Sequence, residues 1–167
     1  EVMYVSAQGS PYVDSQDRGV YRTTDGGKNW KKVLFVDASS GAIDLAMDYT
    51  NPRILYAAFW DHQRLPWYVR SGGKGSGIWK SVDGGDTWEK LEDGLPKSLM
   101  GKIGVTVSRA NPKLLYAIIE SDEGGLYKSQ DGGESWRLVN DERVLRARSW
   151  YYICLLYTSD AADDSRS

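Results

Sequence analysis

The sequence predicts an all-β protein, a β-propeller fragment built of four-stranded antiparallel blades, and three observations lead to this prediction. The chain of 167 residues contains 18 Gly and 7 Trp, a composition typical of many short strands joined by tight turns. A twelve-residue segment centred on Asp-Gly-Gly occurs three times. A second pattern, in which one apolar run leads through Asn-Pro into another, occurs twice, and no segment combines helical periodicity with helix caps.

The threefold segment predicts three β-hairpins. Its copies occupy residues 19–30, 77–88 and 125–136, and their Asp residues are 58 and 48 positions apart. Glycine adopts a positive φ without strain and Asp accepts hydrogen bonds from nearby amides, so Asp-Gly-Gly favours a tight turn. A Ser or Thr before the Asp adds a second acceptor, and a Trp after it covers the apolar side of the hairpin. The residues expected to build the three turns are Thr23, Asp25, Gly27, Trp30, Ser81, Asp83, Gly85, Trp88, Ser129, Asp131, Gly133 and Trp136.

Each repeating unit is expected to contain four strands, which we call a to d. The Asn-Pro pattern supplies strands a and b, because Asn-Pro marks a turn, and the hairpin supplies strands c and d. Four antiparallel strands in about 40 to 50 residues match a propeller blade, whereas a β-sandwich, the alternative, does not repeat in units of four. The expected strands are 43–48 and 103–108 (a), 3–7, 54–59 and 114–119 (b), 19–24, 77–82 and 125–130 (c), and 29–34, 87–91 and 135–139 (d).

These strands divide the chain into parts of blades. Residues 1–34 form a partial blade with strands b to d, residues 43–91 and 103–139 form two complete blades, and residues 140–153 begin another. Propellers close with at least four blades, so we expect a fragment of a longer protein that is only marginally stable alone. Residues 154–167 resemble a translated sequencing adapter and are expected to be a non-native tail. Without them the chain carries 20 acidic and 20 basic residues and no Cys.

The order Ser/Thr-x-Asp-x-Gly-x-x-Trp resembles the Asp-box, or BNR repeat, of sialidase-like propellers, sortilin-type VPS10 domains and xyloglucanase-like propellers. Together with Gly41–Ala46, Gly94–Pro96 and Ile103–Val105, it is similar to bacterial secreted proteins described as glycosyl hydrolase or VPS10/sortilin-like. The resemblance covers residues 1 to 152. It implies an extracellular or periplasmic protein whose Asp-boxes have a structural role and lie away from the active site.

The topology places candidate ligand-binding residues at the end of the blades opposite the Asp-boxes. Antiparallel strands alternate ends, so the b–c and d–a loops share that end. The b–c loop of the middle blade, residues 60–76, is the longest of the three and holds the only His and two Trp. The candidates are Trp60, Asp61, His62, Arg64, Trp67 and Tyr68, with Arg148 and Tyr151 from the last d–a loop. Alternatively, Trp60, Trp67 and Tyr68 pack between blades.

Composition and spacing exclude several classes of function. The net charge of −2 lacks the basic footprint of a nucleic-acid binder, and no stretch approaches the ~20 apolar residues of a membrane span. A single His and a single Cys do not suggest a metal centre or cofactor, and Trp136 stands where a calcium loop requires Gly. Residues 72–77 are rich in Gly but lead into a strand, whereas a phosphate loop opens a helix.

Two functions remain open, and a third alternative is a repeat that binds no ligand. The first is a scaffold that recognises a peptide, protein or glycan, with the remaining blades of the polypeptide as its other partners. The second is a glycoside hydrolase whose active site is completed by missing blades, because glycoside hydrolysis usually needs two carboxylates. A desolvated pair with a shifted pKa would favour the hydrolase. The sequence matches neither the arginine cluster of sialidases nor the catalytic Asp of xyloglucanases. The acidic residues expected at the candidate end are Asp37, Asp61, Glu120, Asp122, Glu123, Asp141 and Glu142.

Overall fold

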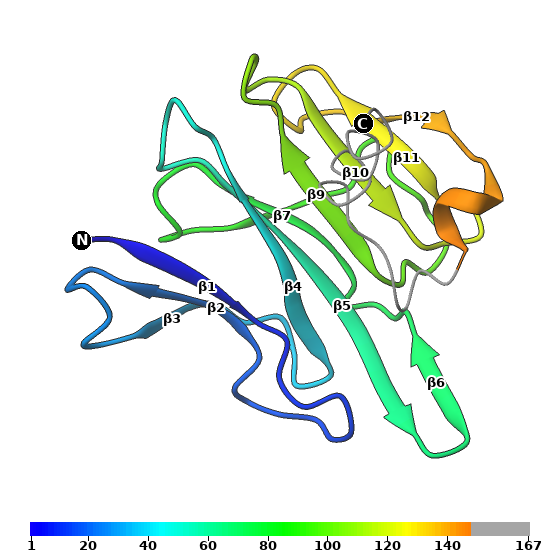
Figure 1. Cartoon of the computed structure of the whole chain (residues 1–167), viewed down its shortest axis with the longest axis horizontal. Helices are drawn as coiled ribbons and strands as arrows, with labels where there is room; N and C mark the ends of the chain where they lie inside the picture. Colours follow the sequence, from blue (N-terminus) through cyan, green and yellow to red (C-terminus); the bar gives the residue numbers. More distant parts are fainter. Residues whose placement is uncertain (148–167) are drawn as a thin grey trace, which may run out of the picture.

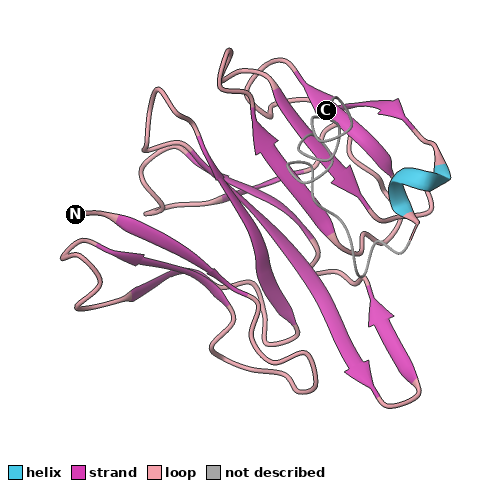
Figure 2. Cartoon of the chain, in the orientation of Figure 1, coloured by secondary structure: helices cyan, strands magenta, loops and turns pink. Residues whose placement is uncertain are grey.

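The computed structural model describes residues 1–147 as three antiparallel β-sheets and one 3-10 helix, Arg143–Arg146 (Figures 1 and 2). The first sheet has the order β1-β2-β3 and is the partial blade. Its strands are β1 (Met3–Ala7), β2 (Gly19–Thr23) and β3 (Lys31–Leu34).

The second and third sheets each contain a four-stranded meander. The second has the order β4-β5-β7-β8, and the third has the order β9-β10-β11-β12. This architecture confirms the predicted fold class of antiparallel four-stranded blades. The strands are β4 (Ser40–Met47), β5 (Leu55–Leu65), β7 (Gly77–Ser81), β8 (Glu89–Leu91), β9 (Ile103–Val107), β10 (Leu115–Ile119), β11 (Gly125–Ser129) and β12 (Arg137–Asn140).

The middle sheet departs from the sequence prediction at residues 60–76, which we expected to be a loop. Instead, β5 continues to Leu65 and turns through Pro66 and Trp67 into β6 (Tyr68–Ser71), which pairs only with β5. Figure 1 shows this β5–β6 hairpin projecting beyond the rest of the sheet. The backbone of this stretch forms its hydrogen bonds with β6 and does not depend on burial in the core. Its side chains can therefore be charged, and a hydrophobicity pattern does not indicate the strand.

Two hydrophobic clusters hold the sheets together. The smaller joins the first and second sheets and includes Val20, Ala42 and Phe59; the Phe59 ring meets Trp79 edge to face, with centroids 4.9 Å apart. The larger cluster joins the second and third sheets. Its buried members are Tyr56, Ala58, Ile78, Leu91, Leu95, Met100, Ile103, Val105, Val107, Leu115, Ala117, Ile119, Tyr127 and Trp136.

The first strands of the two complete blades lie side by side and are linked by a buried acid. The Asp44 side chain on β4 accepts a hydrogen bond from the Val105 backbone N–H on β9 at 2.9 Å. Burial favours the neutral form of this carboxyl and raises its pKa, against the opposing effect of two backbone hydrogen bonds. Asp44 therefore satisfies an edge-strand N–H that no neighbouring strand pairs with.

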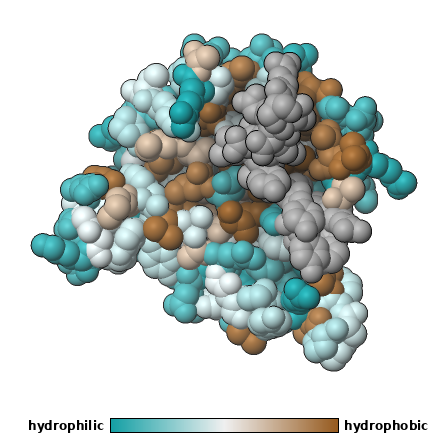
Figure 3. Space-filling model, viewed as in Figure 1, coloured by the Kyte–Doolittle hydropathy of each residue, from teal (hydrophilic) through white to brown (hydrophobic). Residues whose placement is uncertain are grey.

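The face seen in Figure 3 carries hydrophobic residues in the region where β1 and β4 lie. A hollow of about 490 Å³ lies between these strands and is lined by Met3, Leu45, Met47 and Leu55, among others. Residues 1–147 contain no helix that is long and apolar enough to span a membrane.

Candidate ligand-binding site

The three Asp-box turns have one geometry. In the second, the Ser81 hydroxyl accepts the Gly85 N–H at 2.8 Å, and Asp83 Oδ1 accepts the Thr87 N–H at 2.9 Å. The Trp88 indole N–H then donates to the Gly85 carbonyl at 3.1 Å. The first and third turns repeat these contacts with Thr23, Asp25, Gly27, Asn29 and Trp30, and with Ser129, Asp131, Gly133, Ser135 and Trp136.

Each box carboxylate accepts three or four hydrogen bonds. The backbone N–H of Asn29, its side-chain amide and the Thr23 hydroxyl together lower the pKa of Asp25 to about 2. The Thr87 hydroxyl and backbone N–H hold the pKa of Asp83 well below its ordinary value, and Ser135 does the same for Asp131. Ionised groups occupied in this way suit the structural role that the sequence predicts for the boxes.

The β5–β6 hairpin lies at the opposite end of the middle blade and carries six of the eight candidate residues. Four of them lie on β5, Trp67 lies in the turn and Tyr68 begins β6. The segment 8–18 between β1 and β2 flanks the hairpin: the Arg64 N–H donates to the Pro11 carbonyl at 2.7 Å, and the Gln63 side chain donates to the Tyr12 carbonyl at 3.3 Å. Arg148 and Tyr151 lie outside the described residues.

Trp60 and His62 form a buried base for the hairpin. Their rings stack with centroids 4.1 Å apart and planes 13° apart, and they are 6% and 2% exposed. His62 Nδ1 lies 3.1 Å from the Trp60 carbonyl, which only accepts, so Nδ1 carries the proton and Nε2 accepts from the Gln8 amide at 3.0 Å. Burial lowers the pKa of His62 and favours this neutral form. Because both ring nitrogens are engaged, this structure leaves His62 no free nitrogen for a general base.

The carboxylates below the hairpin are also engaged. Asp61 forms an ion pair with Arg70 at 2.9 Å. The Trp60 indole N–H donates to the Ser71 hydroxyl at 2.9 Å, and that hydroxyl donates to Glu120, directly after β10, at 2.7 Å. These contacts join the base of the hairpin to the neighbouring blade.

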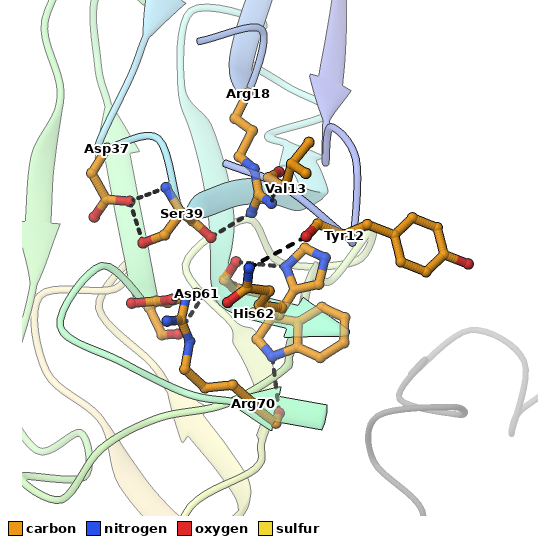
Figure 4. Close-up of polar contacts among 12 residues, drawn as sticks. Tyr12, Val13, Arg18, Asp37, Ser39, Asp61, His62 and Arg70 are labelled. Carbon is orange, nitrogen blue, oxygen red and sulfur yellow. Dashed lines mark hydrogen bonds and ion pairs between the residues drawn. The ribbon is translucent and has the colours of Figure 1, made fainter. Parts of the chain in front are cut away.

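Arg18, which the sequence analysis did not identify, organises the segment beside the hairpin (Figure 4). Its side chain is fully buried, and its guanidinium donates to the carbonyls of Ser10, Val13 and Ser39. Desolvation lowers the pKa of Arg18, and nearby acids, with Asp14 first, oppose this effect. The only signal in the sequence is a lone cation directly before strand c. Its partners are backbone carbonyls, which every residue has, so the sequence does not indicate them.

These buried contacts leave an exposed set of aromatic side chains, which we call the aromatic rim: Tyr12, Trp67 and Tyr68. Their exposed fractions are 60%, 81% and 56%. Figure 4 shows the Tyr12 ring directed away from the polar cluster around Arg18. The structure therefore separates the predicted candidates into a buried support, Trp60 and His62, and an exposed tip, Arg64, Trp67 and Tyr68.

Three acids near this end are already engaged by neighbouring groups. Burial of Asp37 favours its protonated form, but hydrogen bonds from the serines that follow it outweigh burial and lower its pKa. Asp61 is paired with Arg70, and Glu120 accepts from the Ser71 hydroxyl and the Lys102 N–H. Residues 1–147 contain no group of three or more His, Cys, Asp or Glu arranged to hold a metal ion.

Comparisons with known proteins agree with the repeat architecture. A family model described as BNR/Asp-box repeat matches residues 21–32. A comparison with curated proteins finds no significant match. Solved structures resemble the chain more widely, and three of them cover 83% to 84% of its length.

The GH74 enzyme of Niastella koreensis is 22% identical with a TM-score of 0.52, and the GH74 xyloglucanase of Xanthomonas campestris is 19% identical with a TM-score of 0.57. YCF48 bound to D1 peptide is 12% identical with a TM-score of 0.51. The chain spans 21% and 20% of the two GH74 proteins and 44% of YCF48. The chain has the β-propeller fold, and its residues 21–32 match the BNR/Asp-box repeat.

Proposed function

We propose that this chain is part of a recognition propeller whose aromatic rim binds a glycan by stacking, within the wider class of scaffolds that recognise glycans, peptides or proteins. One observation carries the proposal. Trp67, at 81% exposure, stands at the tip of a hairpin whose base is fixed in two neighbouring blades. An exposed indole offers a large, flat apolar face, and such a face suits stacking on a sugar ring.

The contacts beneath the aromatic rim hold the segments that carry its side chains in place. Arg18 fixes the segment that carries Tyr12, and the Trp60–His62 stack fills the base of the hairpin. Side chains held on a rigid scaffold lose little conformational entropy when a ligand binds. The aromatic rim is therefore preorganised for ligand binding.

The comparisons supply precedents for both ligand classes. One similar structure is a xyloglucanase and another is bound to a peptide. We favour a glycan because Trp67 and Tyr68 are adjacent aromatics on an uncovered tip.

We also propose an extracellular or periplasmic location and the VPS10/sortilin-like character that the sequence resemblance implies. Fractionation of the native host would test the location.

The alternative is a glycoside hydrolase completed by further blades of the same polypeptide. Its support is the likeness to two GH74 enzymes. Against it, the structure pairs Asp61 with Arg70, and Asp37 has a lowered pKa where a general acid needs a raised one.

Binding assays with the full chain test the proposal. We expect one or more soluble β-glucans, xyloglucan included, to bind, and Trp67→Ala and Tyr68→Ala each to weaken binding roughly threefold to tenfold, the value of one aromatic contact. Tyr49→Ala is the matched control, because Tyr49 is also 56% exposed but follows strand a, at the Asp-box end.

Three results would count against glycan recognition. Equal affinity of Trp67→Ala and Tyr49→Ala would remove the rim from the site. Binding of a peptide library but of no glycan would favour a peptide ligand. Release of reducing sugar that Asp61→Asn abolishes would favour the hydrolase.

A further inference from the structure

The faces between neighbouring blades repeat one polar contact, which does not involve the aromatic rim. Tyr4 lies directly opposite Arg22 across β1 and β2, and Tyr56 lies opposite Lys80 across β5 and β7. We call such a cross-strand tyrosine and cation a docking pair. Each of these two docking pairs contacts the Asp-box turn of the following blade.

The first docking pair holds the second Asp-box turn. The hydroxyl of Tyr4 and the guanidinium of Arg22 both donate to the Gly84 carbonyl, at 2.8 and 2.7 Å. Arg22 also forms an ion pair with Asp86 at 2.8 Å, and this contact raises the pKa of Arg22. The Arg22 side chain is only 18% exposed in this arrangement.

The second docking pair repeats the contact on the third turn. Tyr56 donates to the Gly132 carbonyl at 2.8 Å, and the Lys80 ammonium lies 2.6 Å from the Glu134 carboxylate. A Cβ at Gly133, where φ is 90°, would lie 3.2 Å from the Tyr56 ring. The docked turn therefore needs the second glycine of its Gly-Gly step and an acid three residues after the box Asp, as at Asp86 and Glu134.

The third blade carries the same docking pair, but no Asp-box turn within residues 1–147 contacts it. Tyr116 lies directly opposite Lys128 across β10 and β11, and the ammonium lies 5.9 Å from the Tyr116 ring centroid. Within the described part of the chain, Lys128 forms no ion pair. We propose that this face binds the Asp-box turn of a further blade, with Asp or Glu three residues after the box Asp.

The charges argue against a second copy of this chain as the occupant. The second and third turns are already docked, so a copy offers only its first turn, where no atom lies within 4 Å of a Cβ built on Gly26. At the position of the acid, that turn has Lys28. Lys28 and Lys128 would then face each other, and like charges at an interface are unfavourable. The face thus selects an acidic turn and rejects the chain's own.

This charge rule is tested with the whole protein, using the first turn as the probe. Self-association of the 167-residue chain is measured by sedimentation at low salt, where ion pairs are least screened. Lys28→Glu and Lys128→Glu should each associate roughly tenfold more tightly than the unaltered chain, because each creates a Glu–Lys contact. The double variant should return to weak association, and Tyr116→Phe should weaken the association of Lys28→Glu.

Lys97→Glu is the matched control, since it makes the same charge change in the segment between β8 and β9, at the rim end of the blades. Association of Lys97→Glu equal to that of Lys28→Glu would overturn the proposal. Strong association of the double variant, or single variants that stay as weakly associated as the unaltered chain, would also overturn it. Tight association of the unaltered chain would identify a second copy as the occupant.

Discussion

At the scale of single residues, Tyr56 connects the core to the contact between blades. Its side chain is 2% exposed and its hydroxyl donates to the Gly132 carbonyl of the next blade. Burial raises the pKa of Tyr56 to about 12, and the nearby charges of Asp48, Glu134 and Asp131 add to this effect. The neutral phenol is therefore part of the folded structure.

This pKa predicts a loss of stability at alkaline pH. An unfolded tyrosine loses its proton near pH 10, whereas folded Tyr56 keeps it to about pH 12. Between these values the unfolded chain binds fewer protons, so the free energy of unfolding falls as pH rises, by at most about 2 to 3 kcal/mol. Urea unfolding at pH 8 to 12 measures this fall.

Tyr56→Phe separates this effect from the titration of lysines. At pH 8 the variant should lose about 1 kcal/mol, the value of one hydrogen bond. Between pH 10 and 12 its stability should fall less steeply than that of the unaltered protein. Parallel curves for the two proteins would contradict the assignment to Tyr56.

At the residue scale, a sequence indicates best those contacts in which a side chain acts on nearby backbone. The Asp-box turns were predictable because Asp, Ser or Thr, and Gly have strong local preferences, and the turn contacts follow them. Arg18 was not predictable, because it acts on carbonyls up to 21 positions away. The exposed state of Trp67 and the buried state of Trp60 also depend on the sheet and not on residue type.

At the scale of elements, the hairpins carry both the structural and the candidate binding residues. The four-strand order of each complete blade followed from the repeat. The sequence missed the extension of β5 into the β5–β6 hairpin because Asp61, His62 and Arg64 interrupt its apolar pattern. A polar strand that is held by its neighbour's backbone leaves only a weak signal in sequence.

The third Asp-box turn should depend on its carboxylate. Asp131→Ala removes an acceptor of three hydrogen bonds, from the Ser135 N–H, the Ser135 hydroxyl and the Ser129 hydroxyl. We expect a loss of about 1.5 to 3 kcal/mol in the free energy of unfolding, the range for hydrogen bonds to a charged group. Thermal and urea unfolding at pH 7 measure the loss.

Asp122→Ala is the control for this prediction, because Asp122 is an exposed acid outside the Asp-box turns. The lowered pKa of Asp131 adds a pH signature: its contribution is complete above about pH 4 and is lost as pH falls below that value. Equal stability of the two variants at pH 7 would show that the box carboxylate is not structural.

At the scale of the whole molecule, stability is divided between two interfaces of unequal size. The larger cluster joins the second and third sheets, and the smaller joins the first sheet to the second. A chain built from stacked units holds each unit mainly through its neighbours. The first sheet therefore has the weaker attachment.

Phe59→Ala should release the first sheet before the others. Phe59 is fully buried in the smaller cluster, and truncation of such a side chain costs about 3 to 5 kcal/mol. In hydrogen exchange, amides of β1 and β2 should lose protection while those of β10 and β11 keep most of theirs. Phe35→Ala, at a residue that is 38% exposed, should leave both regions protected.

A uniform loss of protection across all three sheets would contradict this division.

The fold class and strand order were predictable because they follow from the repeat itself. The relative size of the interfaces was not, because it depends on which apolar residues meet between sheets that are distant in sequence. The aromatic rim likewise combines the segment 8–18 with the β5–β6 hairpin, about 50 residues apart in sequence.

The uninterrupted course of β5 has a mechanical consequence. The same backbone that ends beside Trp67 pairs with β4 on one side and β7 on the other. A pull on the tip along the strand axis loads these ladder hydrogen bonds in shear, so that many must yield together instead of opening one by one. A tether attached there would draw its resistance to force from the centre of the middle blade.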